Sequence, residues 1–359
     1  MEPIPWRKSE WSVVFQSCHV GATKPRAAGV RYSWTYVRRG AFDNLSILQH
    51  GAPAILNTTS LASVIVLVTG VFWGVYWVPV RAIADLGLDG AWGTGAITLA
   101  AMLFLLPFVA RKTHVFRDTG LVGVVSIALG GAAFALYSIG FLYGKVALVV
   151  LLWFFSPVWS VLVAKFVFRW HVPPLRLVAI GVGLVGLFIM LGGDGGLPVP
   201  RSLGEWMAFI GGLVWAGATA GMRLKSRVPP LPAAFMFALG ATLTSFAFAP
   251  FLEPLPTIAA ADVARIGLTV LVTGGLWWGL SIAALMWATL RLDPARVGIL
   301  LMPEVIFGAL TAAIFAGETL SASEMIGGGL VILCGLLEVW PTKAAAKHAP
   351  PLKPVPPHG

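Results

Sequence analysis

Charged residues are scarce in this chain of 359 residues. Asp, Glu, Lys and Arg make up 11% of it, whereas 58% is hydrophobic and the mean hydropathy is +0.85. A soluble domain usually has about 25% charged residues, so the composition excludes that class. Several apolar runs are instead long enough to cross a hydrocarbon core of about 30 Å. The sequence therefore predicts a helical membrane protein with many spans.

Cysteine is nearly absent, and histidine and aspartate are missing from the apolar runs. Cys18 lies in a basic N-terminal segment and Cys334 in an apolar run, which excludes a disulfide framework. The six histidines lie in tails or between runs, no Asp lies within a run, and no metal-ligand spacing is present. We therefore expect no metal, no cofactor and no enzymatic activity.

Acidic residues are fewer than basic ones, 15 against 25. The cations lie between the runs and in both tails, where they set membrane topology, so we expect no nucleic-acid partner. With alternating sides, the side of the N-terminus holds 20 of them and Lys165 lies within a run. The opposite side holds Arg81, Lys145, Arg201 and Arg265. This asymmetry predicts that both termini are cytoplasmic, and we expect a bacterial plasma (inner) membrane protein.

Ten apolar runs follow one another along the chain. They fall at about 61–80, 91–110, 119–141, 146–168, 176–193, 205–222, 231–251, 266–290, 295–317 and 323–341. Each matches the length of a spanning helix. The predicted fold class is an all-α integral membrane protein with ten transmembrane helices.

Two halves of the chain resemble each other. Trp73 precedes Arg81 by eight residues in the first run, as Trp215 precedes Arg223 in the sixth. One constant shift superposes 156–168 on 304–316, and Gly181 on Gly329. Because each half has five spans, an odd number, the halves must insert upside down relative to each other. Inverted repeats place a binding site at the midplane between them.

The expected domains are two repeats and two tails. They are a disordered basic N-terminal arm (1–60), a first five-helix repeat (61–193), a second five-helix repeat (205–341) and a disordered Lys/Pro-rich tail (342–359). The arm is either a cytoplasmic segment that touches anionic lipid or an upstream extension of a chain that begins near Leu61.

Four segments of the sequence resemble a known family. FWGVYWVPVR, LLWFFSPVWSVLVAKFVF, LVWAGATAGMR and AIFAGETLSASEMIGGGLVILCG look like the EamA-type branch of the drug/metabolite transporter superfamily, over roughly residues 61–341. The resemblance implies ten helices in two inverted repeats. It also implies a secondary transporter that moves a small metabolite, such as an amino acid or other amphipathic molecule, often outward.

The sequence departs from the family pattern at two places. Gly317-Glu318 has only Arg169-Trp170 as its counterpart in the first half, and the usual Glu-Pro order is reversed in Pro303-Glu304. We therefore do not infer from other members of the family which ion, if any, drives transport by this chain. The alternative is a channel or a non-transporting membrane receptor, although no selectivity filter is evident in the sequence.

Glu304 is an acidic residue deep within the run 295–317. A charge at the centre of a spanning helix costs about 3 kcal/mol, so the side chain should face protein or water. It is either a protonated packing group or a site that contacts substrate and exchanges a proton with each side of the membrane. We hypothesise the second role, proton coupling.

Aromatic and hydroxyl side chains are the other candidates for a substrate cavity. Trp73, Tyr76 and Trp77 share one helix face; we assign the first two to the cavity and the third to the membrane interface. Trp153 and Ser156 in the fourth run, and Trp278 and Ser281 in the eighth, complete the set. Trp277 and Trp278 are adjacent, so one of them should face lipid.

Three further residues suggest movement. Pro157 and Pro303 lie near the middle of their runs, where each removes a backbone hydrogen bond. They are either hinges or packing kinks. Lys165 should extend to the inner headgroups, with an inner-gate role as the alternative.

Overall fold

The computed structural model describes residues 58–110, 114–167, 169, 173–192, 197–225, 228–292 and 294–339. The Lys/Pro-rich tail lies outside the described residues, as does the basic arm up to residue 57. The predicted end of the arm at residue 60 is wrong by three residues. Residues Thr58–Ser60 already form the first turn of α1 (Thr58–Gly74).

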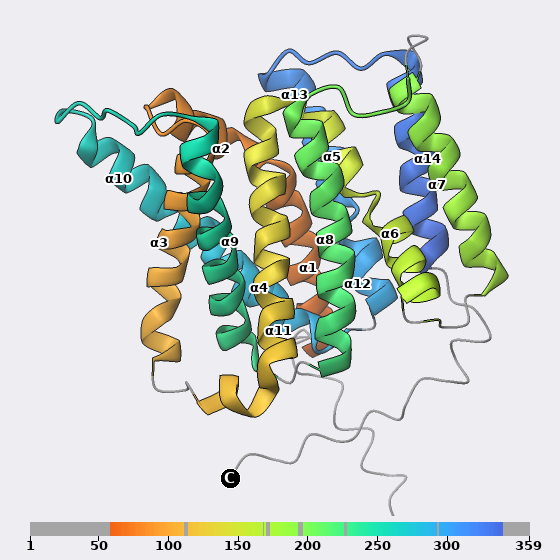
Figure 1. Ribbon diagram of the computed structural model, residues 1–359, viewed down its shortest axis with the longest axis horizontal. Helices are drawn as coiled ribbons and strands as arrows, with labels where there is room; N and C mark the ends of the chain where they lie inside the picture. Colours follow the sequence, from red (N-terminus) through yellow and green to blue (C-terminus); the bar gives the residue numbers. More distant parts are fainter. Residues whose placement is uncertain are drawn as a thin grey trace, which may run out of the picture. The chain divides into compact units, whose positions relative to one another are not determined.

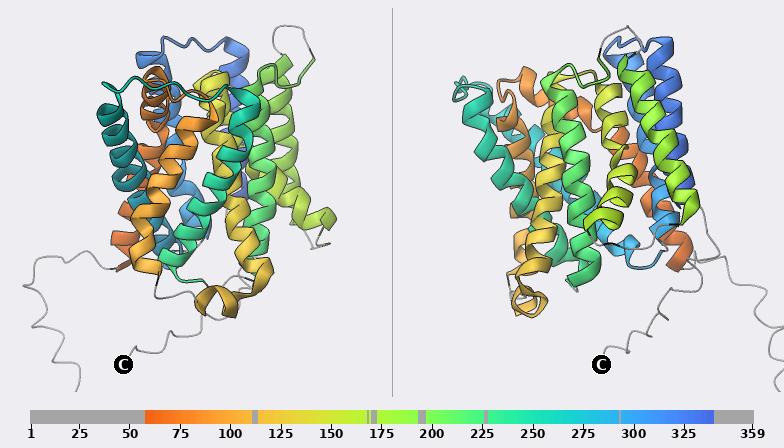
Figure 2. Two further views of the ribbon diagram at one scale, coloured as in Figure 1. Left: turned by 60° about the vertical axis from the view of Figure 1, so that its left-hand side comes forward. Right: turned by 45° about the vertical axis from the view of Figure 1, so that its right-hand side comes forward.

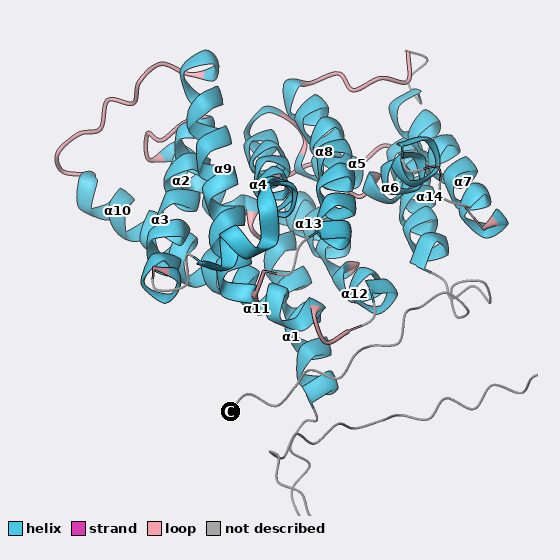
Figure 3. Ribbon diagram, turned by 60° about the horizontal axis from the view of Figure 1, so that its bottom comes forward, coloured by secondary structure: helices cyan, strands magenta, loops and turns pink. Residues whose placement is uncertain are grey.

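All the regular structure in the described ranges is helical (Figure 1; Figure 3), which confirms the all-α class. The other α-helices are α2 (Trp77–Asp85), α3 (Ala91–Val109), α4 (His114–Tyr143), α5 (Val146–Trp153), α6 (Ser156–Leu162), α7 (Pro174–Gly192), α8 (Leu203–Lys225), α9 (Pro230–Leu252), α10 (Val263–Leu271), α11 (Leu280–Thr289), α12 (Pro294–Leu301), α13 (Pro303–Phe315) and α14 (Ala322–Val339). Two π-helical stretches are η2 (Val163–Val167) and η3 (Val272–Gly279).

Eight helical stretches are long and apolar enough to span a membrane. They are Thr58–Asp85, Ala91–Val109, His114–Tyr143, Val146–Val167, Pro174–Gly192, Pro230–Leu252, Val263–Thr289 and Arg296–Phe315. The sixth and tenth predicted runs are also helical, as α8 and α14, but fall outside this set. That all ten helices cross the membrane stays a prediction.

Three of the spanning stretches are broken near their middles. The breaks separate α1 from α2, α5 from α6, and α12 from α13. Pro79, Pro157 and Pro303 each lie in the first turn after a break. Proline suits that position, because a backbone N–H in the first turn of a helix has no acceptor within the helix, so its absence costs no hydrogen bond. The sequence predicted hinges or kinks at Pro157 and Pro303, and the structure has complete helix breaks there and before Pro79.

The second halves of the two repeats have the same helix spacing. α5 and α12 are equally long and begin at Val146 and Pro294. α7 and α14 begin at Pro174 and Ala322, which are separated by the same number of positions. Figure 1 shows α5 above α6 but α12 below α13, so the two broken helices run in opposite directions. The constant shift that relates the two halves in the sequence therefore also relates the first residues of these helices.

Glycines bring the helix breaks close to one another. A Cβ atom on Gly74, at the end of α1, would lie 2.7 Å from the carbonyl oxygen of Glu304 at the start of α13. A Cβ atom on Gly308 would lie 3.1 Å from Val150 of α5. Such close approach of helices depends on glycine. It places segments of both halves around a single buried region.

Candidate functional site

Glu304 is buried in this region, with 2% of its surface exposed, in the first turn of α13. The hydroxyl of Tyr137, from the middle of α4, donates a 2.9 Å hydrogen bond to its Oε1 atom. The free N–H groups of a helix N-terminus favour negative charge. The carboxyl group thus has one hydroxyl donor and a favourable helix end.

No cation is buried beside this carboxyl group. Among the described side chains, the other buried acid is Glu205, whose carboxylate accepts hydrogen bonds from Ser202 and from the backbone of Arg201 at the start of α8. That arrangement is a helix cap. In the described part of the chain no Lys, Arg or His is buried. Among the described side chains, Glu304 is therefore the only buried acid or base of the site.

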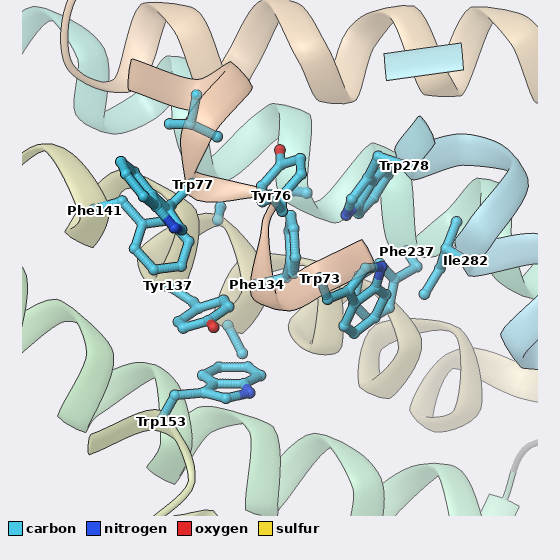
Figure 4. Close-up of a cluster of buried hydrophobic side chains, with 14 of the residues drawn as sticks. Trp73, Tyr76, Trp77, Phe134, Tyr137, Phe141, Trp153, Phe237, Trp278 and Ile282 are labelled. Carbon is cyan, nitrogen blue, oxygen red and sulfur yellow. The ribbon is translucent and has the colours of Figure 1, made fainter. Parts of the chain in front are cut away.

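Aromatic rings from both halves of the chain gather around Tyr137 (Figure 4). The Tyr137 ring stacks on Trp153 of α5, with centroids 4.7 Å apart and an interplanar angle of 22°. Phe134, one turn earlier on α4, lies 5.8 Å from Trp73, 5.6 Å from Tyr76 and 4.9 Å from Trp278. We call these six residues, Trp73, Tyr76, Phe134, Tyr137, Trp153 and Trp278, the aromatic cluster.

A hydrogen bond between the halves joins two of the predicted site residues. The Nε1 atom of Trp73 on α1 donates to the hydroxyl of Ser281 on α11 at 3.1 Å, and that hydroxyl donates to the carbonyl of Trp278. The structure thus brings together Trp73, Ser281 and Trp278, which are up to 208 positions apart. Their convergence was expected of a site between the halves.

Trp77 corrects an interpretation of the sequence. It was assigned to the membrane interface, but its side chain is buried and its Nε1 atom donates a 3.0 Å hydrogen bond to Thr311 on α13. Trp77 begins α2 directly after the break, and its indole meets α13 of the second half. The neighbouring pair differs in burial, because Trp278 is buried while Trp277 is half exposed beside Phe72. That Trp277 faces lipid stays a prediction.

Two polar atoms of the aromatic cluster are buried without a partner. They are the hydroxyl of Tyr76 and the Nε1 atom of Trp278, whose side chains are 1% and 0% exposed. The Tyr76 hydroxyl lies near Ser138 but makes no hydrogen bond of standard geometry, and the Ser138 hydroxyl is already paired with Thr94. Such groups are uncommon in native proteins and need an explanation.

The remaining predicted residues lie apart from the aromatic cluster. Ser156 is half buried in the first turn of α6, next to Pro157. Lys165 is exposed on η2, with its Nζ atom 5.6 Å from the Phe166 ring centroid. Pro303 precedes Glu304 at the break between α12 and α13. The structure places both prolines at helix breaks next to the site and Lys165 at its periphery.

The aromatic cluster is closed in this conformation, because its rings pack on one another. Two hollows, of about 300 and 210 Å³, lie elsewhere, between α3 and η3 and between α13 and α14. None of the predicted side chains lines either hollow. All six side chains of the cluster are buried, so a molecule reaches them only when the packing around them opens.

Ionic contacts hold one end of the bundle together above the site. Arg81 on α2 forms a 3.2 Å ion pair with Glu318, which follows α13, and also donates to the carbonyls of Phe141 and Gly144. The Glu318 carboxylate also accepts hydrogen bonds from the first backbone N–H groups of α5. Sequence reasoning counted Arg81 only among the cations that set membrane topology and missed this connection.

Sequence reasoning also missed Tyr137 and Phe134. Tyr137 is followed by Ser138 inside an otherwise apolar run, and a polar pair of this kind could have marked α4 as facing the site. Nothing local in the sequence indicates which acid it would meet 167 positions later.

Comparison with known proteins gives one family. The model described as "EamA-like transporter family" matches the chain twice, over residues 60–192 and 202–338. No curated protein matches. A solved structure described as "Crystal structure of protein" is 17% identical and has a TM-score of 0.48, covering 77% of this chain and 97% of its own.

Proposed function

The chain belongs to the EamA-like transporter family, and we propose on this premise that it is a secondary transporter that exports a small amphipathic metabolite. An amino acid is one such molecule. The observation that carries the proposal is the buried Tyr137–Glu304 hydrogen bond within the aromatic cluster. Flat apolar rings and one buried carboxyl group, contributed by both halves, suit a molecule with an apolar body and a polar end.

We propose ten spanning helices in two inverted repeats, 61–193 and 205–341. The equal spacing of helix starts and the opposite directions of the broken helices support this arrangement. Contacts between α7 and α14, which lie side by side (Figure 2), support it further. A Cβ atom on Gly183 would lie 2.9 Å from Sγ of Cys334, and one on Gly186 would lie 3.1 Å from the backbone nitrogen of Val331. The shift that superposes one repeat on the other exchanges these two contacts, as an approximate twofold axis requires.

We propose that both tails are cytoplasmic and that the protein lies in a bacterial inner membrane. On the opposite side of the bundle, Arg81 and Lys145 form ion pairs with Glu318 and Glu324. Two of the four cations on that side are therefore balanced by carboxylates. The positive-inside rule itself counts Lys and Arg, of which the side of the tails holds 20 and the opposite side four.

The proposed mechanism is alternating access coupled to protons. When the halves separate on one side, water reaches Glu304, and the carboxyl group can release a proton there and bind substrate instead. Pro157 and Pro303 are proposed hinges, because each lies at a helix break beside the site. Lys165, exposed beyond the end of α6, is a proposed inner-gate residue.

Glu304→Gln tests this function directly. Gln keeps the shape of a protonated Glu and can still accept a hydrogen bond from Tyr137, but it cannot exchange a proton. We expect the variant to lose substrate accumulation driven by a proton gradient in sealed vesicles and to keep substrate exchange. A metabolite-efflux screen in cells that express the parent protein identifies the substrate first.

Glu205→Gln is the matched control, because this acid is also buried but serves as a helix cap. Gradient-driven transport by the Glu304→Gln variant at the parental rate and pH dependence would refute proton coupling. A parent protein that exports nothing in the screen would refute the transport function itself.

A further inference from the structure

Two hydrogen-bond donors of the aromatic cluster make no hydrogen bond of standard geometry, and the rings that carry them both pack on Phe134. The Tyr76 hydroxyl is carried by a ring 5.6 Å from Phe134, and the Trp278 indole by one 4.9 Å from Phe134 on the second half of the chain. Figure 4 shows the indole nitrogen of Trp278 turned toward Tyr76 and Phe134. The rings that carry the two donors therefore share one neighbour, Phe134.

The other buried indoles nearby provide a comparison. The Nε1 atoms of Trp73 and Trp77 donate to Ser281 and Thr311. In the described part of the chain the Trp278 indole has no acceptor, and the Tyr76 hydroxyl has only Ser138 beside it, without standard geometry. The Nε1 atom of Trp159, in a separate cluster on α6, is also unpaired. A buried donor without an acceptor destabilises the protein, so these two are costly unless a ligand supplies what is missing.

We propose that Tyr76 and Trp278 bind an acceptor oxygen, a carboxylate or a carbonyl, of the transported molecule. This inference rests on the proposed transport function and specifies the chemistry of one end of the substrate. The Tyr76 hydroxyl and the indole N–H donate to the acceptor, and the Phe134 ring packs against the apolar body beside it. The donors come from α1–α2 and η3, so an acceptor bound by both would join the two halves.

The test uses purified full-length protein in lipid nanodiscs and three probes with one skeleton. L-Phenylalanine carries a carboxylate, L-phenylalaninamide carries a neutral carbonyl, and phenethylamine carries neither. The parent protein should bind at least one acceptor-bearing probe roughly tenfold or more tightly than phenethylamine, the gain expected of a buried hydrogen bond. The carboxylate and amide probes distinguish the two kinds of acceptor.

Tyr76→Phe and Trp278→Phe should each reduce this preference by about tenfold and leave phenethylamine binding unchanged. Trp277→Phe is the matched control, because its indole donates to the carbonyl of Phe72 and lies on the half-exposed side. It should keep the parental preference. Tyr76→Phe keeps the ring and should leave the thermal stability unchanged or raise it, which separates lost recognition from misfolding.

Three outcomes would overturn the inference: equal parental affinity for all three probes, no binding of any probe, or a preference that survives in both variants. The efflux measurement described above is independent of these probes. A protein that exports its substrate yet shows one of these outcomes would refute the acceptor site and leave the transport function standing.

Discussion

Removal of the Glu318 carboxylate should open the end of the bundle above the site. This carboxylate accepts hydrogen bonds from Arg81 on α2 and from the backbone nitrogens of Val146 and Ala147 in the first turn of α5. It thereby joins the segment after α13 to two helices of the first half. Glu318→Ala breaks all three contacts and leaves the aromatic cluster unchanged.

The size of the effect follows from the exposure of the partners. The Arg81 and Glu318 side chains are 30% and 12% exposed, so their ion pair contributes about 1 kcal/mol, the upper end for surface pairs. Loss of a carboxylate that caps a helix N-terminus costs about 1 kcal/mol more. These contacts form only while the helix ends are together. The open conformation should therefore gain about 2 kcal/mol, or roughly 30-fold in population.

Labelling of a buried cysteine measures that population. Val80 on α2 is buried and close in size to cysteine, so Val80→Cys, in a background without native cysteines, reports opening to a membrane-impermeant maleimide. We expect Glu318→Ala to raise the labelling rate about 30-fold. Lys145→Ala is the control, because the Lys145 side chain is 49% exposed in its pair with Glu324 and should change the rate less than about threefold.

Two results would refute this reasoning. Unchanged labelling together with a lower melting temperature in Glu318→Ala would mean that the carboxylate holds the fold and does not restrict opening. An equally large effect of Lys145→Ala would mean that any loss of charge at this end has the same consequence.

Two further predictions concern packing and topology. Gly131→Ala should destabilise the protein by about 2–3 kcal/mol in thermal unfolding, because its Cβ atom would overlap the Phe237 carbonyl oxygen on α9. Gly181→Ala is the control and should not destabilise it, because the space around Gly181 is open. Equal melting temperatures of the two variants would contradict the close α4–α9 contact. A cysteine at the exposed position Thr257 should be labelled from outside intact cells. A cysteine at the exposed position Asp118 should be labelled only after permeabilisation. External labelling at Asp118 would contradict the proposed topology.

The helices could be predicted from the sequence because their cause is local. A span in lipid must satisfy its backbone within the segment and present apolar side chains over its length, so hydropathy alone placed a helix at each of the ten runs. The effect of Pro157 and Pro303 was also foreseen in direction, since proline removes a hydrogen bond wherever it lies inside a helix.

The contacts of the site could not be predicted in the same way. Tyr137 and Glu304 meet across 167 positions, and Arg81 and Glu318 across 237. No periodicity within a helix encodes which side chain of another helix it will meet. Trp77 was misplaced for a related reason: its position near the end of the first run indicated the interface, whereas its partner Thr311 lies 234 positions later.

The exchanged contacts between α7 and α14 have the form of a subunit interface in a homodimer. Gly183 meets Cys334 as Val331 meets Gly186, and the shift between the two repeats converts each contact into the other. In a dimer with twofold symmetry each such contact necessarily occurs twice. The connection between α7 and α8 is therefore the one place where the chain could be divided into two five-helix polypeptides, and α7 and α14 would then recognise each other as the helices of two separate subunits do.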